Sequence, residues 1–515
     1  MSMVLLARGI DVSPLDRVGQ VSGLAGLQLR YAVLGLVLLA VVAITATARW
    51  ARLSALTVRM VAAGAAGLFS GLVAGAVVVA LRGTSWGLFG PVGDAGTLTA
   101  MARNLLETGW VPTTYPPGFI HALAGYAELT GSTPEHSLKV LQIVLTALYG
   151  PAVYLAWRLL LPPLWALGVG VVAALPVVET YKPYEPIALA LLIPVLLLLL
   201  RHLRRSGGMS WRRLALAGVG FGLALGAIFE LYSAWFVWSA PGVLAAALLV
   251  FPWRRGATRG LTLVAVTAVV FALIGHRHLL GLVEIHDSFP DRWFYYDAYV
   301  EPAYFAMGRA MPGVNVGQWP PPGELGGVGL FTVLLLAGLM AALTVAWRRT
   351  IVLALACIFA GAWIMRFLIS SRMYAGNAVD FYPRTATELL YCLLLLTGFG
   401  IYYTVQRVRA STPAGWSALA VSSPVRVGVV AALLLLFASA GSAIGDRYMP
   451  RTDDSWGAAA FWSHISRQVD GKCPSYLATL GVSCLPGDMP FEEIMRRFTD
   501  GAPRPGELPH VLKPG

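Results

Sequence analysis

The stretch Met60-Val-Ala-Ala-Gly-Ala-Ala-Gly-Leu-Phe-Ser-Gly-Leu-Val-Ala-Gly-Ala-Val-Val-Val-Ala-Leu81 contains no charged residue, and Arg59 and Arg82 flank it on either side. A transmembrane helix needs about 20 consecutive, mainly apolar residues. Only a helix satisfies all its backbone polar groups within one such segment, so this stretch predicts a membrane span. Its glycines Gly67, Gly71 and Gly75 recur at every fourth position, which predicts close packing against neighbouring helices.

The rest of the chain repeats this apolar pattern. Hydrophobic residues make up 57% of the 515 residues, charged residues make up 12%, and the mean hydropathy is +0.69. These values are typical of an all-α polytopic membrane protein. The apolar runs predict about 12 spans, at residues 32–48, 60–81, 137–157, 164–178, 187–200, 214–231, 234–251, 261–279, 327–346, 351–369, 385–405 and 427–445.

The positions of the arginines predict the orientation of these spans, because short cytoplasmic loops are enriched in Lys and Arg. Four connections are basic and hold almost no acid; their arginines are Arg201, Arg204, Arg205, Arg212, Arg213, Arg254, Arg255, Arg259, Arg348, Arg349, Arg407 and Arg409. We expect these connections to face the cytoplasm. The long loops 82–136 and 280–326, and by alternation the N-terminus, then face outward.

This topology predicts a transmembrane domain over 1–445 and a small extracytoplasmic region over 446–515. The net charge of +12 follows mainly from the basic cytoplasmic connections, and we expect no nucleic-acid partner. Cys357 and Cys392 fall within spans and are expected to pack there. Cys473 and Cys484 lie close together in the outward region, where oxidising conditions permit a disulfide; two free thiols are the alternative.

The first outward loop holds a carboxylate at a suggestive place. Asp94 stands where a helix over 97–108 is expected to begin, and Arg103 follows it within that helix. Interaction of Asp94 with free amides at the helix start is the simpler explanation. Beyond this helix, Tyr115-Pro116-Pro117-Gly118 precedes a short apolar segment, 119–129, which contains His121 and is predicted to lie at the membrane interface.

An Asp in the first outward loop, a following helix, a Pro-Pro dipeptide and a juxtamembrane helix together resemble the GT-C superfamily of polyprenyl-phosphate glycosyltransferases. Three further stretches resemble the actinobacterial galactan 5-O-arabinofuranosyltransferases. They are Gln318-Trp-Pro-Pro-Pro-Gly-Glu-Leu-Gly326, Tyr382-Pro-Arg-Thr385 and Asp470-Gly-Lys-Cys-Pro474. The resemblance implies a GT-C-type helix bundle in the plasma membrane, with an active site on the extracytoplasmic side and Asp94 as its catalytic base.

The chemistry expected of such a site needs a carboxylate and a phosphate-binding cation. In an inverting transfer, the carboxylate accepts the proton of the acceptor hydroxyl while that oxygen attacks the anomeric carbon. A departing phosphate is already ionised, so cations or hydrogen-bond donors suffice to hold it. The candidate cations are Lys182, which Tyr181 and Tyr184 flank, then Arg372 and Arg384, and Arg366 within a span. Interfacial anchoring is the competing explanation for each of them.

Several residues are candidates for substrate contacts. Tyr115, Tyr181, Glu185 and Asp380 lie near the candidate cations, and Tyr296, Asp297 and Trp319 belong to an aromatic loop that is suited to carbohydrate or to the membrane surface. His278, with His276 and Arg277, suggests a phosphate or acceptor contact, or an interfacial anchor. Their spacing matches no metal motif, so we expect neither a metal nor another cofactor.

The resemblance implies transfer of D-arabinofuranose from decaprenylphosphoryl arabinose to cell-wall galactan. A polyprenyl-phosphate-mannose mannosyltransferase is the alternative enzyme. A secondary transporter or lipid flippase is the alternative from another class, and it predicts helices broken near mid-membrane and two corresponding halves. No such repeat is evident in the sequence.

Overall fold

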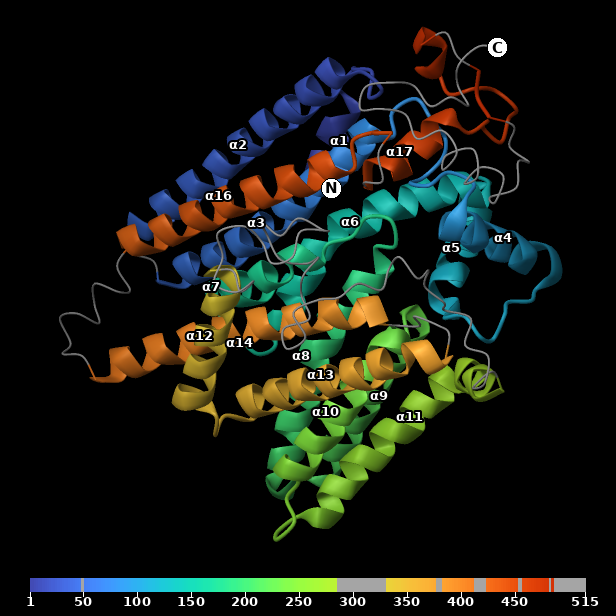
Figure 1. Cartoon of the computed structure of the whole chain (residues 1–515). Helices are drawn as coiled ribbons and strands as arrows, with labels where there is room; N and C mark the ends of the chain where they lie inside the picture. Colours follow the sequence, from blue (N-terminus) through green and yellow to red (C-terminus); the bar gives the residue numbers. More distant parts are fainter. Residues whose placement is uncertain are drawn as a thin grey trace.

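The computed structural model describes residues 1–47, 51–284, 330–376, 382–411, 423–452, 456–480 and 483–485, and within them the chain is all-helical (Figure 1). Nine of the described helices are long and apolar enough to cross a membrane, and two shorter apolar helices accompany them. The protein is therefore a polytopic membrane protein. The described part contains no β-strand; its β-structure is limited to an isolated β-bridge between Ser466 and Leu485.

The N- and C-terminal spans form one side of the bundle. Helix α3 (Ala51–Ala80) packs against α2 (Arg17–Thr47), α16 (Ser423–Arg447) and the short α1 (Ser2–Arg8). Figure 1 shows α2, α3 and α16 side by side although α16 follows them by several hundred residues. The glycines of α3 permit these contacts: a Cβ at Gly71 would lie 3.2 Å from Met3, and one at Gly75 would lie 3.2 Å from Leu27.

The middle spans form the other side. Helix α6 packs against α3 and α8, and α9 packs against α11. Helix α13 packs against α10 and α14, and α12 packs against α14. Their bounds are α6 Pro134–Arg158, α8 Tyr184–Arg205, α9 Trp211–Leu231, α10 Ala234–Val250, α11 Ala257–Glu284, α12 Leu330–Ala346, α13 Thr350–Gly376 and α14 Tyr382–Ser411. Helix α8 touches α6, α9, α10 and α13, so it lies at the centre of the bundle.

The span predicted at 164–178 is not a continuous helix. The segment forms α7 (Pro163–Trp165), a π-helical turn over Ala166–Val171 and a 3-10 turn over Leu175–Val177. Pro176 lacks the amide proton that a continuing α-helix would use, and Gly170 lies so close to Trp157 that a Cβ would come within 2.2 Å of its ring. The segment between α6 and α8 is therefore an interrupted helix, not the continuous span that its apolar composition predicted.

The two ends of the bundle differ in what they contain. Helices α4 (Gly93–Thr108), α5 (Pro117–Thr130) and α17 (Trp456–Ile465) gather at one end, as Figure 1 shows. The N-terminal segment lies at this end too, since Arg82 pairs with Asp11 at 3.0 Å. At the opposite end the basic connections meet: Arg204 donates to the Arg348 carbonyl at 3.1 Å, and Arg259 donates to the Gly207 carbonyl. The first loop, the N-terminal segment and α17, which are expected to face outward, thus share one end, and the basic connections share the other.

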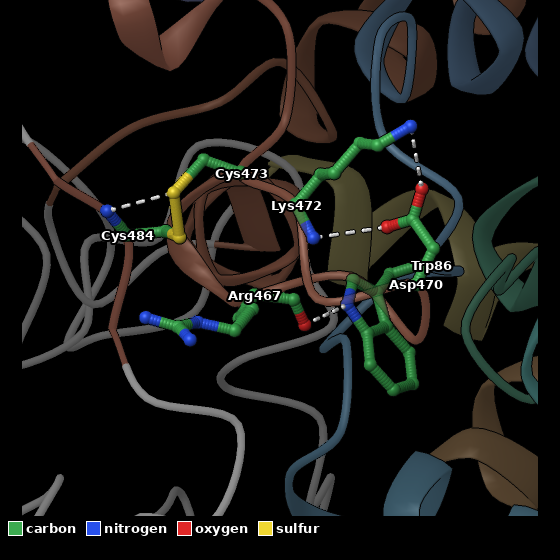
Figure 2. Close-up of a disulfide and its surroundings, with 6 residues drawn as sticks. All are labelled: Trp86, Arg467, Asp470, Lys472, Cys473 and Cys484. Carbon is green, nitrogen blue, oxygen red and sulfur yellow. Dashed lines mark hydrogen bonds and ion pairs between the residues drawn. A yellow bond between two sulfur atoms is a disulfide. The ribbon is translucent and has the colours of Figure 1, made fainter.

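The described part of the C-terminal region packs onto the first loop. Thr84 Oγ1 donates to the Ser463 carbonyl at 2.7 Å, and the Phe89 amide donates to the Ala459 carbonyl at 2.7 Å. Cys473 and Cys484 form a disulfide with a Cα–Cα distance of 5.5 Å. Figure 2 shows this disulfide beside Trp86, whose indole N–H donates to the Arg467 carbonyl at 3.0 Å. The tail is thereby fixed against the loop that carries Asp94.

Candidate functional site

Asp94 lies in the first turn of α4, at the end of the bundle where α4, α5 and α17 gather. Val92 is the N-cap residue, and no side chain caps the helix. The Asp94 carboxylate instead forms an ion pair with the Lys182 ammonium. Lys182 is buried, with 10% of its side chain exposed, whereas 51% of the Asp94 side chain is exposed. Asp94 thus presents a solvent-accessible carboxylate beside a buried cation.

Tyr181 holds α4 in this position. Its hydroxyl accepts a hydrogen bond from the Ala95 amide at 3.0 Å, and its ring lies 4.5 Å from that of Phe89. Gly93 has a φ of +59°, a left-handed conformation that glycine adopts without a Cβ penalty. Behind Tyr181, the Gln142 amide donates to the Tyr181 carbonyl at 2.9 Å. These contacts fix the distance between the start of α4 and the segment that carries Lys182.

A second ion pair lies one helical turn further along the same segment. Arg384 Nε is 3.1 Å from Glu185 Oε1, and both side chains are nearly buried, with 11% and 10% exposed. The Trp235 indole N–H donates to the Glu185 carbonyl at 2.9 Å, which fixes the backbone there. The Arg384 guanidinium also lies 5.2 Å from the centre of the Tyr232 ring. The segment 179–185 therefore joins two opposite-charge pairs, one from α4 and one from α14.

Tyr115 links the remainder of the first loop to this cluster. Its hydroxyl is 2.8 Å from the Tyr184 hydroxyl, and Phe119 of α5 stacks on the Tyr184 ring at 4.3 Å. Burial raises the pKa of Tyr115, while the nearby Lys182 charge lowers it in part. The phenol is therefore a neutral hydrogen-bonding group at neutral pH. It supplies a donor close to the two cations.

The charges of the cluster perturb one another. Burial and, to a smaller extent, the neighbouring Glu185 carboxylate raise the pKa of Glu179 to about 8 against the opposing effect of Lys182. Burial by itself would lower the pKa of Lys182, but Tyr115 and Asp94 bring it above its ordinary value. Lys182 therefore remains a cation across the physiological range. Shifts of this kind, produced by burial together with specific charged partners, are typical of functional sites.

A cavity of about 130 Å³ lies beside the cluster. Glu179 and Glu185 line it together with Trp235, Tyr448 and Trp456. The Tyr448 hydroxyl accepts a hydrogen bond from the Thr180 amide at 3.1 Å, so α16 and the tail form part of the wall. Carboxylates next to flat aromatic rings provide hydrogen-bond acceptors and apolar faces at one place.

Arg366 is adjacent to the cluster, and its guanidinium is bonded to another side chain of the protein. It is buried in α13, and its Nη1 donates to Thr385 Oγ1 at 2.7 Å, one residue beyond Arg384. Such a contact positions the start of α14. Arg366 therefore supports Arg384 from the side of α13 and is further from solvent than Lys182.

Four other predicted residues lie apart from the cluster. Arg103 pairs with Glu135 at the start of α6, and Arg372 is exposed on α13. His121 bonds the Pro117 carbonyl of its own helix at 2.8 Å. His278 is buried: Nδ1 contacts the Thr113 carbonyl at 2.7 Å and Nε2 contacts Ser233 Oγ at 2.9 Å. These contacts give His278 a bracing position between α11, the first loop and α10.

The remaining predicted contacts, Tyr296, Asp297, Trp319 and Asp380, lie outside the described residues, as does most of the loop 280–326. Conversely, Glu179, Tyr184, Gln142, Tyr448 and Trp456 were not predicted as site residues. Glu179 and Tyr184 belong to the same short segment as Lys182, and Gln142 is a polar residue in an apolar span; both features were visible in the sequence. The contributions of Tyr448 and Trp456 depend on how α16 and α17 pack.

Among the described residues, no group of three or more His, Cys, Asp and Glu side chains is arranged to hold a metal ion. The chemistry present in the cluster is that of carboxylates, a lysine, an arginine and phenols. No model of a known protein family matches the chain, and a search of curated proteins finds no match to its sequence.

Proposed function

We propose that the chain is a membrane glycosyltransferase of the GT-C type. It transfers D-arabinofuranose from decaprenylphosphoryl arabinose to cell-wall galactan at the outer face of the plasma membrane, with inversion at the anomeric carbon. The observation that carries the proposal is the ion pair of an accessible carboxylate, Asp94, with the nearly buried Lys182, three residues before Glu185, which holds a second nearly buried cation, Arg384. The choice of sugar and acceptor rests on the resemblance of the sequence motifs.

The geometry suits this transfer in the following way. Asp94 accepts the proton of the acceptor hydroxyl as its oxygen bonds to the anomeric carbon. The bond between that carbon and the phosphate oxygen breaks, and polyprenyl phosphate leaves as an anion. Lys182 and Arg384 stabilise the negative charge on the departing phosphate, and the Tyr115 hydroxyl donates a further hydrogen bond. Binding of the phosphate draws Lys182 away from Asp94 and frees the carboxylate to act as a base.

A polyprenyl-phosphate mannosyltransferase would use the same groups, so only the donor distinguishes that alternative. A secondary transporter or flippase is favoured by one observation, the broken segment between Pro163 and Val177. Discontinuous helices occur at substrate sites of transporters. Such a protein would move its lipid without needing Asp94 as a base.

The test is transfer by the purified full-length chain, reconstituted in lipid and supplied with radiolabelled decaprenylphosphoryl arabinose and a short galactan. We expect Asp94→Asn to reduce turnover by about 10²- to 10⁴-fold, the usual contribution of a general base. Asp11→Asn is the matched control: Asp11 is exposed at the same end, pairs with Arg82, and lies outside the cluster.

Three outcomes would count against the proposal. Full activity of Asp94→Asn removes Asp94 as the base. Transfer from a mannose donor but not from the arabinose donor favours the mannosyltransferase. Movement of labelled lipid across the bilayer by the folded wild type, without any glycan product and with Asp94→Asn equally active, favours the transporter.

A further inference from the structure

A groove with basic walls lies between α1, α3 and α6, apart from the cluster around Asp94. Its cavity volume is about 330 Å³. Arg8, Arg82, His136 and Lys139 line it, and no Asp or Glu is among its lining residues. Arg8 ends α1, Arg82 follows α3, and His136 and Lys139 lie in the first two turns of α6. The groove therefore places positive charge at the level of the membrane surface.

The basic side chains differ in how many of their N–H groups are bonded within the protein. Arg82 pairs with Asp11 at 3.0 Å and donates to the Arg8 carbonyl at 3.1 Å. Lys139 donates to the carbonyls of Leu81 and Thr84 at 2.9 and 2.6 Å. An ammonium has three N–H groups, so one donor of Lys139 remains. The side chains of Arg8 and His136 are exposed beside it.

The part of the groove that lies within the membrane spans is aliphatic. Val78 from α3 and Val140, Ile143 and Val144 from α6 line it, further into the spans than Arg82 and Lys139. In the spans of α3 and α6, such side chains match hydrocarbon. A cationic part at the ends of the helices, next to an aliphatic part within the spans, is complementary to a lipid that has a phosphate headgroup and acyl chains.

The groove and the Asp94 cluster lie on different faces of α6. Residues 136, 140, 143 and 144 recur at helical spacing and line the groove. Glu135 and Gln142 point elsewhere, toward Arg103 of α4 and toward Tyr181. Helix α6 thus separates the two places, and a ligand in the groove does not reach the candidate base.

We propose that this groove binds an anionic phospholipid, with the headgroup phosphate held by Arg8 and Lys139 and one acyl chain lying along Val140 and Val144. Basic pockets between transmembrane helices are a common site for acidic headgroups. The bound lipid joins α1 to α3 and α6, and it stabilises the end of the bundle to which the first loop and the tail are attached. The inference does not depend on any glycosyltransferase activity.

The experiment measures lipid retention by the purified full-length chain, using native mass spectrometry, and its thermal unfolding in detergent. The probes are phosphatidylglycerol, phosphatidylcholine and soluble glycerol phosphate. We expect phosphatidylglycerol to be retained and to raise the unfolding temperature, whereas phosphatidylcholine and glycerol phosphate do neither. Arg8→Gln should weaken retention by about tenfold, as expected for loss of one charge-assisted contact.

Two further variants separate the headgroup from the acyl chain. Val140→Trp fills the aliphatic part of the groove and should abolish phosphatidylglycerol retention without changing any charge. Arg467→Gln is the matched control, because Arg467 is an exposed arginine at the same end of the bundle and outside the groove. It should retain the lipid as the wild type does.

Arg8 is exposed, so we expect Arg8→Gln to fold. Lys139 is left unchanged in this experiment, because its bonds to backbone carbonyls contribute to the fold. Equal retention of phosphatidylcholine would overturn the proposal, and so would wild-type retention of phosphatidylglycerol by both Arg8→Gln and Val140→Trp. Full competition by glycerol phosphate would reduce the groove to a phosphate site and remove the lipid.

Discussion

The two ends of the bundle both carry many cations, yet they use them differently. At the basic end, Arg204 and Arg259 contact backbone carbonyls, and Arg349 lies 5.6 Å from the centre of the Tyr403 ring. At the loop end, Lys182 and Arg384 are nearly buried and each meets a carboxylate. Arg204 and Arg349 at the first end are exposed to solvent, whereas Lys182 and Arg384 at the second end are desolvated and paired. Only desolvated charge interacts strongly enough to serve chemistry.

Replacement of Lys182 should produce the largest difference between the two ends. We expect Lys182→Met to reduce kcat/KM for the lipid-phosphate donor by about 10²- to 10³-fold, because one donor to the developing phosphate charge is lost. The fold should survive, since Asp94 is half exposed and solvent can replace its partner. Steady-state transfer assays provide the measurement.

Arg213→Gln is the matched control for Lys182→Met. Arg213 is an exposed cation of the basic end and should leave transfer unchanged. An equal loss of activity in both variants would contradict the distinction between the ends. Lys182→Arg, which keeps the charge, should recover part of the activity.

The Glu185–Arg384 pair predicts an effect on stability. Loss of one partner from a buried pair leaves an uncompensated charge and typically costs about 3–5 kcal/mol. We therefore expect Arg384→Met to lower the free energy of unfolding by about that amount, and Arg384→Met with Glu185→Met to be less destabilised than the sum of the two single variants. Denaturant unfolding in detergent measures the cycle.

At the basic end, Arg349→Met removes an exposed arginine that stacks on Tyr403. An exposed cation–π contact contributes about 0.5–1 kcal/mol, so the loss should be small. If Arg349→Met were as destabilising as Arg384→Met, burial would not be what distinguishes the two ends.

The last expected effect is a pH dependence from Glu179. Its pKa is raised from 4.5 to about 8 in the folded protein, so the folded chain holds a proton that the unfolded chain releases. The stability due to this group is complete below about pH 4.5 and is lost as the pH rises through about 8. Melting temperatures between pH 5 and pH 9 should fall more for the wild type than for Glu179→Gln. Parallel curves for the two proteins would show that Glu179 does not titrate in this range.

The sequence predicted best those parts of the site whose residues lie close together along the chain. Tyr181, Lys182 and Glu185 belong to one short polar segment between apolar runs, so their grouping was visible without a structure. The predicted topology also assigned Asp94 and Arg384 to the same outward site, but not the individual pairs, because Asp94 precedes Lys182 by many residues and Arg384 follows Glu185 by many more. His278 was predicted as a phosphate or acceptor contact or an interfacial anchor; its bonds to Thr113 and Ser233 are contacts that no local pattern indicates.

The amino-acid sequence by itself determined that this is a membrane protein of apolar helices and that its basic connections are segregated from the first loop. The reason is that the length and composition of each apolar run decide locally whether it can satisfy its backbone in a bilayer. Tertiary structure alone decided that 164–178 breaks, that the tail lies on the first loop, and that Asp94 meets Lys182. These outcomes depend on which helices pack together, and packing brings residues into contact regardless of their separation along the chain.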